Sequence, residues 1–256
     1  MGGGALMDLY YEINGNGNGH PVVLLTGGAD IRNWTFVAPL LAKHYKVVSF
    51  DGRGTGKSPS PLEDVNPIED LLSLLDYLEI NQATLIGHSM GGQIATEFAL
   101  NYPERVSKLV LIAPGLSGFS YSKEFEENIK KIHEAAPDID KMVELLLSDP
   151  SYRVITASPH RDLMVQMLRH HMNRMFEWPA VKLIWPQRPA IERLEELTPT
   201  TLLIIGKEDS PDNLRVANYI RKHSDTRIIE IPDADHMVNL THPEKLYRQI
   251  TGFMKE

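Results

Sequence analysis

Short apolar runs alternate along most of the chain with stretches in which apolar residues recur every three or four positions. Such runs are typical of buried strands, and the recurring pattern is typical of amphipathic helices. Strands that alternate with helices favour a mainly parallel sheet flanked by helices, so the pattern predicts an α/β fold. The expected strands are "DLYYEI", "PVVLLTG", "KVVSFD", "ATLIG", "KLVLIA", "TTLLIIG" and "RIIEIP".

Helices are expected between and after these strands. The glycine-rich "NGNGNG" joins the first two expected strands, which suggests that they pair as a hairpin. Pro243 opens the last expected helix, at a position where a missing backbone N–H is tolerated. The expected helices cover residues 34–43, 70–78, 91–101, 213–222 and 243–254.

One interval breaks the alternation, because residues 114–199 contain no run that predicts a strand. We expect residues 119–186, here called the cap, to form a helical insertion, and residues 1–118 and 187–256 to form an α/β core. An insertion at the carboxyl edge of an open α/β sheet lies where such sheets bind ligands. The cap is therefore expected to cover a binding pocket.

Half of the ten methionines lie in this interval, and apolar residues from Met164 to Met175 follow a helical stripe. Such a stripe can pack the cap onto the core, or it can form a deformable wall over a pocket. We expect Met167, Met172 and Trp185 to line the substrate pocket.

The composition narrows the classes of function. The net charge is −8 and no basic stripe stands out, which argues against nucleic-acid and anionic-membrane partners. No apolar run approaches ~18 residues, which indicates a soluble globular protein. The 256 residues suit one elaborated domain, and we expect a monomer or homodimer.

Cysteine is absent, which excludes disulfides, a thiol nucleophile and thiolate metal sites and fits a reducing cytoplasm. The histidines show no H-E-x-x-H spacing, and we expect no metal and no cofactor. The opening "MGGGAL" lacks the basic segment and apolar core of a signal peptide. We interpret it as an addition from expression, with the natural start at Met7.

The segment "DGRGTGKSPSP", residues 51–61, is similar at first sight to a nucleotide-binding loop. Such a loop needs Gly, four residues and then Gly-Lys-Ser/Thr, but Asp51 stands where the first glycine should be. Pro59 follows Ser58 and disfavours the helix whose amides would hold a phosphate. We interpret the segment as a tight turn after a strand, with nucleotide binding as the alternative.

The most informative stretch is "ATLIGHSMGGQIATEFAL", in which Gly-x-Ser-x-Gly stands between an expected strand and an expected helix. In this context the pattern predicts a nucleophile elbow with Ser89 at its tip. The turn is sharp and strained, so Gly87 and Gly91, two residues to either side, have to be small. The helix that begins beneath the hydroxyl favours a developing negative charge.

With these motifs the chain resembles the α/β-hydrolase fold family over almost its whole length. The resemblance implies that fold with a helical cap, and relatives among small cofactor-free esterases, lactonases and carbon–carbon bond hydrolases. The glycine-rich segment then resembles the family's D-x-R-G-x-G-x-S turn, a scaffold beside the active site. The matching stretches are "VVLLTGG", "DGRGTGKS", "GHSMGG", "LLIIGKEDSPD" and "IIEIPDADHMVNLTHPEKL".

A serine hydroxyl is a poor nucleophile and needs a base, which a carboxylate orients. In the family these residues follow the order Ser, acid, His. The resemblance therefore implies His236, after the last expected strand, as the base of Ser89, and Asp209, soon after "TLLIIG", as the acid. Glu208 and Asp212 are the alternatives, interpreted as solvated loop charges or helix-start carboxylates.

The resemblance also implies an oxyanion hole formed by the backbone N–H groups of Gly28 and Met90. The family usually has His-Gly in this loop, whereas this chain has Thr26 and Gly27 before Gly28, so the neighbouring hydrogen bonds remain open. His88, inside the elbow, is expected to point back under the turn as a structural residue.

These residues predict a serine hydrolase that cleaves a small ester, lactone or related acyl substrate. A carbon–carbon bond hydrolase, a perhydrolase and an aminopeptidase are alternatives on the same site. An aminopeptidase needs an acidic anchor in the cap, which the sequence does not identify. A receptor that keeps the triad and signals through a partner is an alternative from another class, and fold alone does not decide among them.

Overall fold

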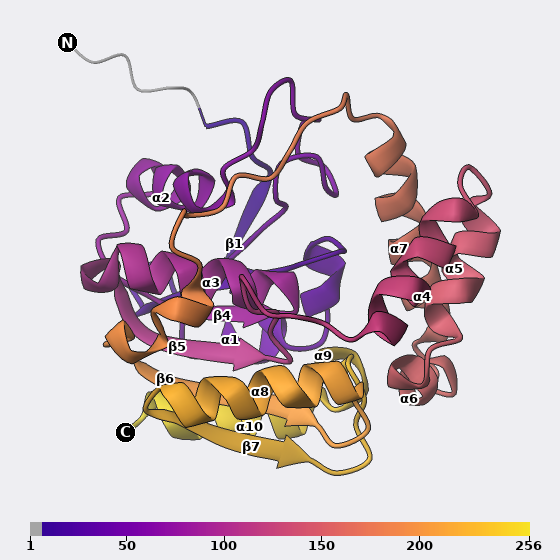
Figure 1. Cartoon of the computed structure of the whole chain (residues 1–256). Coiled ribbons are helices and arrows are strands. Elements are labelled where there is room, and N and C mark those ends of the chain that lie inside the picture. Colours follow the sequence, from indigo (N-terminus) through magenta and orange to yellow (C-terminus); the bar gives the residue numbers. More distant parts are fainter. Residues whose placement is uncertain (1–6) are drawn as a thin grey trace.

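Residues 7–256, which the computed structural model describes, form one seven-stranded sheet (Figure 1). The strand order is β1-β3-β2-β4-β5-β6-β7, and every neighbouring pair is parallel except β1 and β3. This confirms the predicted α/β fold; the interpretation of residues 1–6 falls outside the described residues. The strands are β1 (Tyr11–Gly15), β2 (Pro21–Leu25), β3 (Lys46–Phe50), β4 (Ala83–His88), β5 (Val106–Ile112), β6 (Thr200–Gly206) and β7 (Thr226–Ile231).

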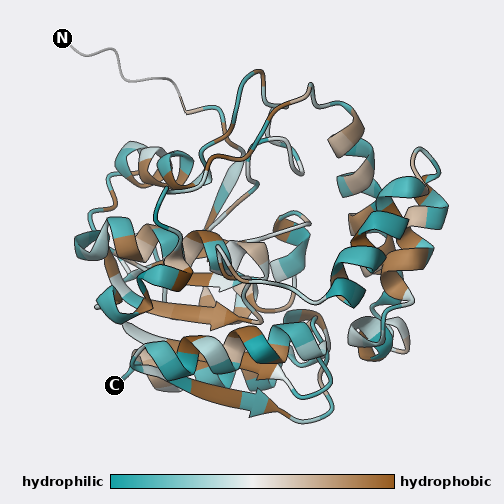
Figure 2. Ribbon diagram, in the orientation of Figure 1, coloured by the Kyte–Doolittle hydropathy of each residue, from teal (hydrophilic) through white to brown (hydrophobic). Residues whose placement is uncertain are grey.

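Helices cover both faces of the sheet. Successive side chains of a strand point to opposite faces, so the apolar strands bury side chains against helices on both sides. Leu25 of β2 packs on one face and Leu24 on the other. Figure 2 shows largely apolar strands between helices that mix apolar and hydrophilic residues. One face carries α2 (Pro67–Tyr77), α3 (Met90–Asn101) and α8 (Pro211–His223), and the other carries α1 (Ala38–Leu41) and α10 (Pro243–Met254).

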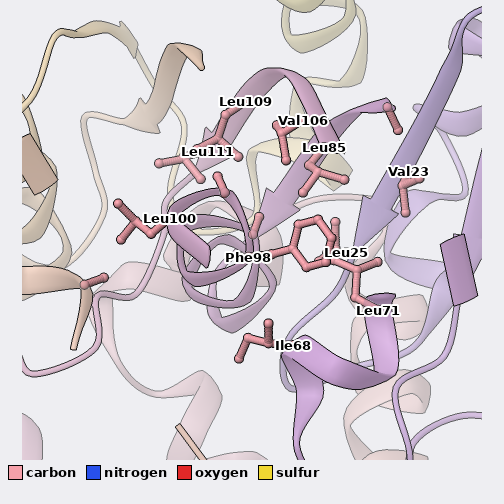
Figure 3. Close-up of a cluster of buried hydrophobic side chains, with 14 of the residues drawn as sticks. Val23, Leu25, Ile68, Leu71, Leu85, Phe98, Leu100, Val106, Leu109 and Leu111 are labelled. Atoms are coloured by element: carbon pink, nitrogen blue, oxygen red, sulfur yellow. The ribbon is translucent and has the colours of Figure 1, made fainter. Parts of the chain in front are cut away.

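The packing of α3 on the sheet fixes the position of the elbow. Phe98 of α3 lies in one apolar cluster with Leu25 of β2 and Leu85 of β4 (Figure 3), and all three are buried. Burial of a side chain of this size contributes about 1.5–3 kcal/mol. Because α3 follows β4 with a single residue between them, this packing also holds the turn that carries Ser89.

Two local predictions are wrong. β1 does not pair with β2 in a hairpin, because β3 and β4 occupy both edges of β2, and β1 joins the outer edge of β3. The expected helix over 34–43 is divided into a 3-10 turn (Ile31–Trp34) and α1. Pro39 explains the break, since proline is tolerated only in the first turn of a helix.

The cap is helical, and residues 114–199, all of them described, contain no sheet strand, as the sequence pattern predicts. Its helices stand beyond the ends toward which β5 and β7 point (Figure 1). The boundaries of the cap as a separate unit remain a prediction. Its helices are α4 (Lys123–Glu134), α5 (Ile139–Leu147), α6 (Arg153–Thr156) and α7 (Arg161–Phe176).

The glycine-rich segment after β3 is a docking platform for the cap. On α7, His170 Nε2 lies 3.1 Å from the carbonyl oxygen of Gly56, and Arg174 donates to the same oxygen at 3.0 Å. Trp178 Nε1 donates to the carbonyl oxygen of Gly54 at 3.0 Å. Gly54 has a φ of +81°, and a Cβ there would lie 2.5 Å from the indole ring. The close approach therefore requires glycine.

Backbone amides of this platform are already used internally. Gly54, Thr55 and Ser58 donate to nearby backbone carbonyls, and the amide of Lys57 donates to the carboxylate of Asp51. A phosphate-binding loop must keep such amides free for its ligand. The geometry favours the scaffold interpretation and gives nucleotide binding no support.

The two core segments that flank the cap lie side by side next to α3, over a buried carboxylate. Ile191 donates its amide to the carbonyl of Ser117 at 3.2 Å. Glu97 of α3 is fully buried, and its Oε1 accepts from the amide of Ala190 at 2.7 Å. Its Oε2 has no hydrogen-bond partner within residues 7–256. Burial raises the pKa of Glu97, although the bond to Ala190, the nearby Ser117 hydroxyl and the charge of Arg193 each lower it.

We expect Glu97→Gln to raise the free energy of unfolding at pH 8 by roughly 1–3 kcal/mol, because a neutral amide costs less to bury than a charged carboxylate. Because the folded-state pKa is raised, the penalty is absent below the unfolded pKa of ~4.3 and grows as pH rises through the folded pKa. The gain should therefore shrink toward pH 4.

Urea unfolding of both proteins at pH 4 and pH 8 measures this gain. Glu104→Gln, at an exposed position just beyond α3, is the matched control and should change little at either pH. An equal gain from Glu97→Gln at both pH values would contradict the electrostatic explanation.

Candidate active site

Ser89 stands at the turn between β4 and α3 in a backbone conformation that few non-glycine residues adopt. Its φ is +56° and its ψ is −122°, in a region that costs of order 1–3 kcal/mol. A Cβ on Gly87 would lie 2.4 Å from the carbonyl oxygen of Gly91, and one on Gly91 would lie 2.3 Å from that of Leu25. Small residues on either side of Ser89 are therefore a steric requirement.

Two further side chains reach this turn from the loops after β6 and β7. His236 Nε2 lies 3.1 Å from Ser89 Oγ, and His236 Nδ1 lies 2.9 Å from Asp209 Oδ2. Because β4, β6 and β7 are parallel, their carboxyl ends meet at one edge of the sheet. The structure thus brings together the three residues that the sequence singles out.

The buried carboxylate of Asp209 fixes the tautomer of His236. Its Oδ1 accepts hydrogen bonds from the Ser210 amide at 2.6 Å and from Asn213 Nδ2 at 2.7 Å. Burial alone would raise the pKa of Asp209, but the charge of protonated His236 and these hydrogen bonds together lower it. The ionised Asp209 accepts the proton of Nδ1, so the lone pair on Nε2 faces Ser89.

The same contact raises the pKa of His236. Burial disfavours the imidazolium, but the charge of Asp209 and its hydrogen bond favour it more strongly. A base whose protonated form is stabilised in this way takes a proton from a neighbouring hydroxyl more readily. The arrangement can therefore activate Ser89 as a nucleophile.

His88 supports the backbone of His236 and takes no part in this chain of contacts. Its Nε2 donates to the carbonyl oxygen of His236 at 2.8 Å, and its Nδ1 accepts from Asn33 at 3.1 Å. Burial and the nearby His236 lower the pKa of His88 to about 3, so its ring stays neutral. This geometry favours the structural role expected for His88.

The loop after β2 packs directly against the beginning of α3. A Cβ on Gly27 would lie 2.6 Å from the amide nitrogen of Met90, whereas one on Gly28 would meet open space. Within residues 7–256 neither the Gly28 nor the Met90 amide donates a hydrogen bond. The Thr26 hydroxyl, at the position where the sequence departs from the family pattern, accepts from Trp34 at 2.8 Å. Both predicted oxyanion donors are thus unused by the described residues, and Met90 directly follows Ser89.

A cavity of about 450 Å³ opens beside Ser89 and His236. Its walls are mostly cap side chains from α4, α5 and the segment that follows, together with residues of the turn itself. Small-molecule pockets commonly have this size and this mixture of apolar and polar groups. The apolar and aromatic lining residues are Met90, Tyr121, Phe125, Ile129, Ile132, Leu145, Leu146, Pro150 and Tyr152.

A second hollow, of about 910 Å³, is larger. It lies by β1 and contains the Asp30–Arg32 ion pair and Asp51, whose oxygens are all bonded within the protein. Ser89 and His236 do not line it. We therefore assign the chemistry to the smaller cavity, in which the hydrogen-bonded chain lies.

Within residues 7–256, no three His, Asp or Glu side chains gather in a way that could hold a metal ion. No helix in the same range is both long and apolar enough to cross a membrane.

The family model for the alpha/beta hydrolase fold matches residues 20–243 of the chain. The chain belongs to the α/β-hydrolase family. It is a hydrolase, and the resemblance seen in its motifs is confirmed across most of its length.

Known α/β hydrolases and related proteins are similar to the chain over nearly its full length. The 2-hydroxymuconate semialdehyde hydrolase of Pseudomonas sp. (strain CF600) is 28% identical, over 96% of this chain and 90% of its own. An acetyltransferase component of the acetoin cleaving system of Pseudomonas putida is 29% identical, over 99% and 68%. A hydrolase structure from Pseudomonas aeruginosa PA01 has a TM-score of 0.80 at 24% identity, over 97% and 94%.

The predicted pocket residues of this α/β hydrolase are wrong. Met167 and Met172 are buried in the apolar cluster of the cap itself, together with Met237 and Leu240 of the core. Trp185 packs against the apolar cluster on the sheet face that carries α2, α3 and α8, and it does not line the cavity either. The stripe on α7 therefore serves packing, which is the other interpretation that the sequence allowed.

The cap's share of the cavity wall comes from α4, from α5 and from the segments next to them, which the sequence pattern did not single out. Phe125, Ile129 and Ile132 of α4 follow i, i+4, i+7 and so share one face, a spacing that marks an apolar face in the sequence. The cap also places two carboxylates, Glu124 and Asp149, in the wall. The sequence alone did not identify acidic residues at this position.

The two alternatives to Asp209 have other partners. Glu208 is exposed and pairs with Arg153 of α6 at 2.7 Å. Asp212 stands in the first turn of α8, as a helix-start carboxylate. It is buried, and it accepts hydrogen bonds from the amide and the hydroxyl of Ser122 at 3.0 and 2.6 Å. Both carboxylates tie the cap to the core, and neither contacts His236.

Proposed function

We propose that the chain is a serine hydrolase that cleaves a small carboxylic ester, lactone or related acyl compound through an acyl-enzyme. One observation carries the proposal. His236 lies between Ser89 and Asp209, at 3.1 and 2.9 Å, in the wall of a cavity of about 450 Å³. This is the arrangement that serine nucleophiles require for activation.

The reaction begins when Ser89 Oγ attacks the carbonyl carbon of the substrate and passes its proton to His236 Nε2. Asp209 holds the imidazole in the required tautomer and stabilises the imidazolium. The oxygen that becomes negative is held by the amides of Gly28 and Met90, next to the N-terminus of α3. Collapse of this intermediate releases the alcohol, which takes the proton from His236, and leaves the acyl group on Ser89.

Hydrolysis of the acyl-enzyme repeats these steps with water as the nucleophile. His236 takes a proton from the water as it attacks the acyl carbon, and then returns the proton to Ser89 Oγ as the acid leaves. The residues of the chain supply every proton transfer in both halves of this scheme. The apolar wall formed by Tyr121, Phe125 and Ile129 fits an uncharged acyl or alcohol group.

A carbon–carbon bond hydrolase is the second candidate. The similarity to a 2-hydroxymuconate semialdehyde hydrolase over 96% of this chain favours it. The same serine, base and cavity would serve a ketone whose carbon–carbon bond is broken by water. Which bond the site cleaves depends on what the cap, residues 119–186, accepts.

A substrate panel separates the two candidates. The panel contains p-nitrophenyl esters of rising acyl length, lactones of matched size and a 2-hydroxy-6-oxo-dienoate, each assayed for kcat/KM. The proposal expects the highest kcat/KM on an ester or lactone. A preference of tenfold or more for the dienoate would replace ester hydrolysis with carbon–carbon bond cleavage.

A further inference from the structure

Asp235, the residue before His236, is a buried carboxylate that the proposed reaction does not use. Its side chain is fully excluded from solvent. Its Oδ1 accepts from the amide of Met237 at 2.9 Å, and its Oδ2 accepts from the amide of Ile155 at 2.8 Å. Asp235 therefore joins the loop that carries His236 to α6 of the cap.

A second contact joins the same two segments. The amide of His236 donates to the carbonyl oxygen of Ser151 at 3.0 Å. The ring of Tyr152 stands edge-on to the imidazole, with centroids 5.8 Å apart and planes at 80°. Residues 151–155 of the cap thus contact His236 through its backbone, its ring and the carboxylate beside it.

These contacts give the base three independent supports. Asp209 orients the ring from the loop after β6, and His88 holds the backbone carbonyl from the end of β4. The cap provides the third, through Ser151 and Asp235. A buried carboxylate is stabilising only when its hydrogen bonds are made, so Asp235 holds its loop correctly only while the cap is docked.

We propose that Asp235 is a positioning residue that clamps the His236 loop to residues 151–155, so that alignment of the imidazole with Ser89 requires a docked cap. The inference rests on the proposed function, in which His236 activates Ser89. It makes the cap a part of the catalytic apparatus as well as a wall of the cavity.

Asp235→Asn tests the clamp. The side-chain amide of asparagine would turn an N–H group toward the backbone N–H of either Ile155 or Met237, so one of the two hydrogen bonds would be lost. A displacement of about 1 Å in a catalytic group can cost ~10²-fold in rate. We expect the rate constant for labelling by a fluorophosphonate to fall ~10–100-fold, while the final extent of labelling, which counts folded sites, stays the same. On the best ester of the panel, kcat should fall by the same factor and KM by less than about threefold.

Asp233→Asn is the matched control. Asp233 lies on the same loop and is exposed, and asparagine tolerates its positive φ of +60°. The substitution removes the same charge three residues from His236 without touching the clamp. Its labelling rate should stay within twofold of the wild type.

The outcomes separate this inference from the proposed function. A wild-type protein that takes no label would overturn the proposed function and this inference with it. Normal labelling of the wild type, with an unchanged rate in Asp235→Asn, would overturn the clamp alone and leave Asp235 as a structural residue.

Amide hydrogen exchange of the wild type decides the question if Asp235→Asn does not fold. The amides of Ile155 and Met237, both bonded to Asp235, and that of His236, bonded to Ser151, should open with one common free energy. Unequal opening of the cap amide and the two loop amides would contradict a clamp that acts as a unit.

Discussion

Replacing Ser89 with alanine is expected to lower kcat by ~10⁴–10⁶ while the protein stays folded, as in other serine hydrolases that lose the nucleophile. Ser89 Oγ is the atom that bonds to the acyl group, and it lies within hydrogen-bond distance of His236 Nε2. Initial rates on the best ester of the panel, with far-UV circular dichroism to check folding, measure the effect.

Ser73→Ala, at an exposed position on α2, is the matched control and should keep wild-type kcat. A loss of less than tenfold in Ser89→Ala would show that another group attacks the substrate.

The strained backbone at residue 89 predicts a gain in stability for Ser89→Gly, because glycine adopts a positive φ without strain.

Asp209→Asn is expected to lower kcat by ~10³–10⁴ with little change in KM. An amide at this position can present its N–H group to His236 Nδ1, which favours the tautomer that leaves no lone pair facing Ser89. The imidazolium formed during attack would also lose its counter-charge. In the best-studied serine protease triad the same substitution costs about 10⁴ with the geometry intact.

Glu208→Gln is the control for this prediction, since its carboxylate is exposed and pairs with Arg153. Its kcat should stay within about tenfold, because solvent screens a charge at that position. Steady-state kinetics of both variants distinguish the two carboxylates. Near-normal kcat in Asp209→Asn, or a collapse in Glu208→Gln, would require a different acid.

The sequence predicts the reactive centre well because its geometry is largely local. The turn at Ser89 depends on small neighbours and on a strand and helix that adjoin in sequence, so the motif and its flanks suffice. Asp209 and His236 are distant in sequence, but each follows a strand of the same parallel sheet, which brings them to one edge. The order Ser, acid, His, which the family resemblance implies, indicated which carboxylate and which histidine to expect.

The sequence marks apolar helix faces but did not locate the pocket, because the period of a helix does not say which neighbour its apolar stripe contacts. The stripe with Met167 and Met172 packs inside the cap and against Met237, while the less conspicuous face with Phe125 meets the cavity. The pairing of β1 with β3 and the contact of Asp235 with α6 likewise depend on tertiary arrangement. Such contacts carry no local signal.

The site of covalent modification is the most direct test of the account. Wild-type protein treated with a fluorophosphonate, digested and examined by tandem mass spectrometry should carry one adduct, on Ser89, and prior incubation with a substrate ester should slow its formation. An adduct on any other side chain, or none at all, would contradict a nucleophile at Ser89.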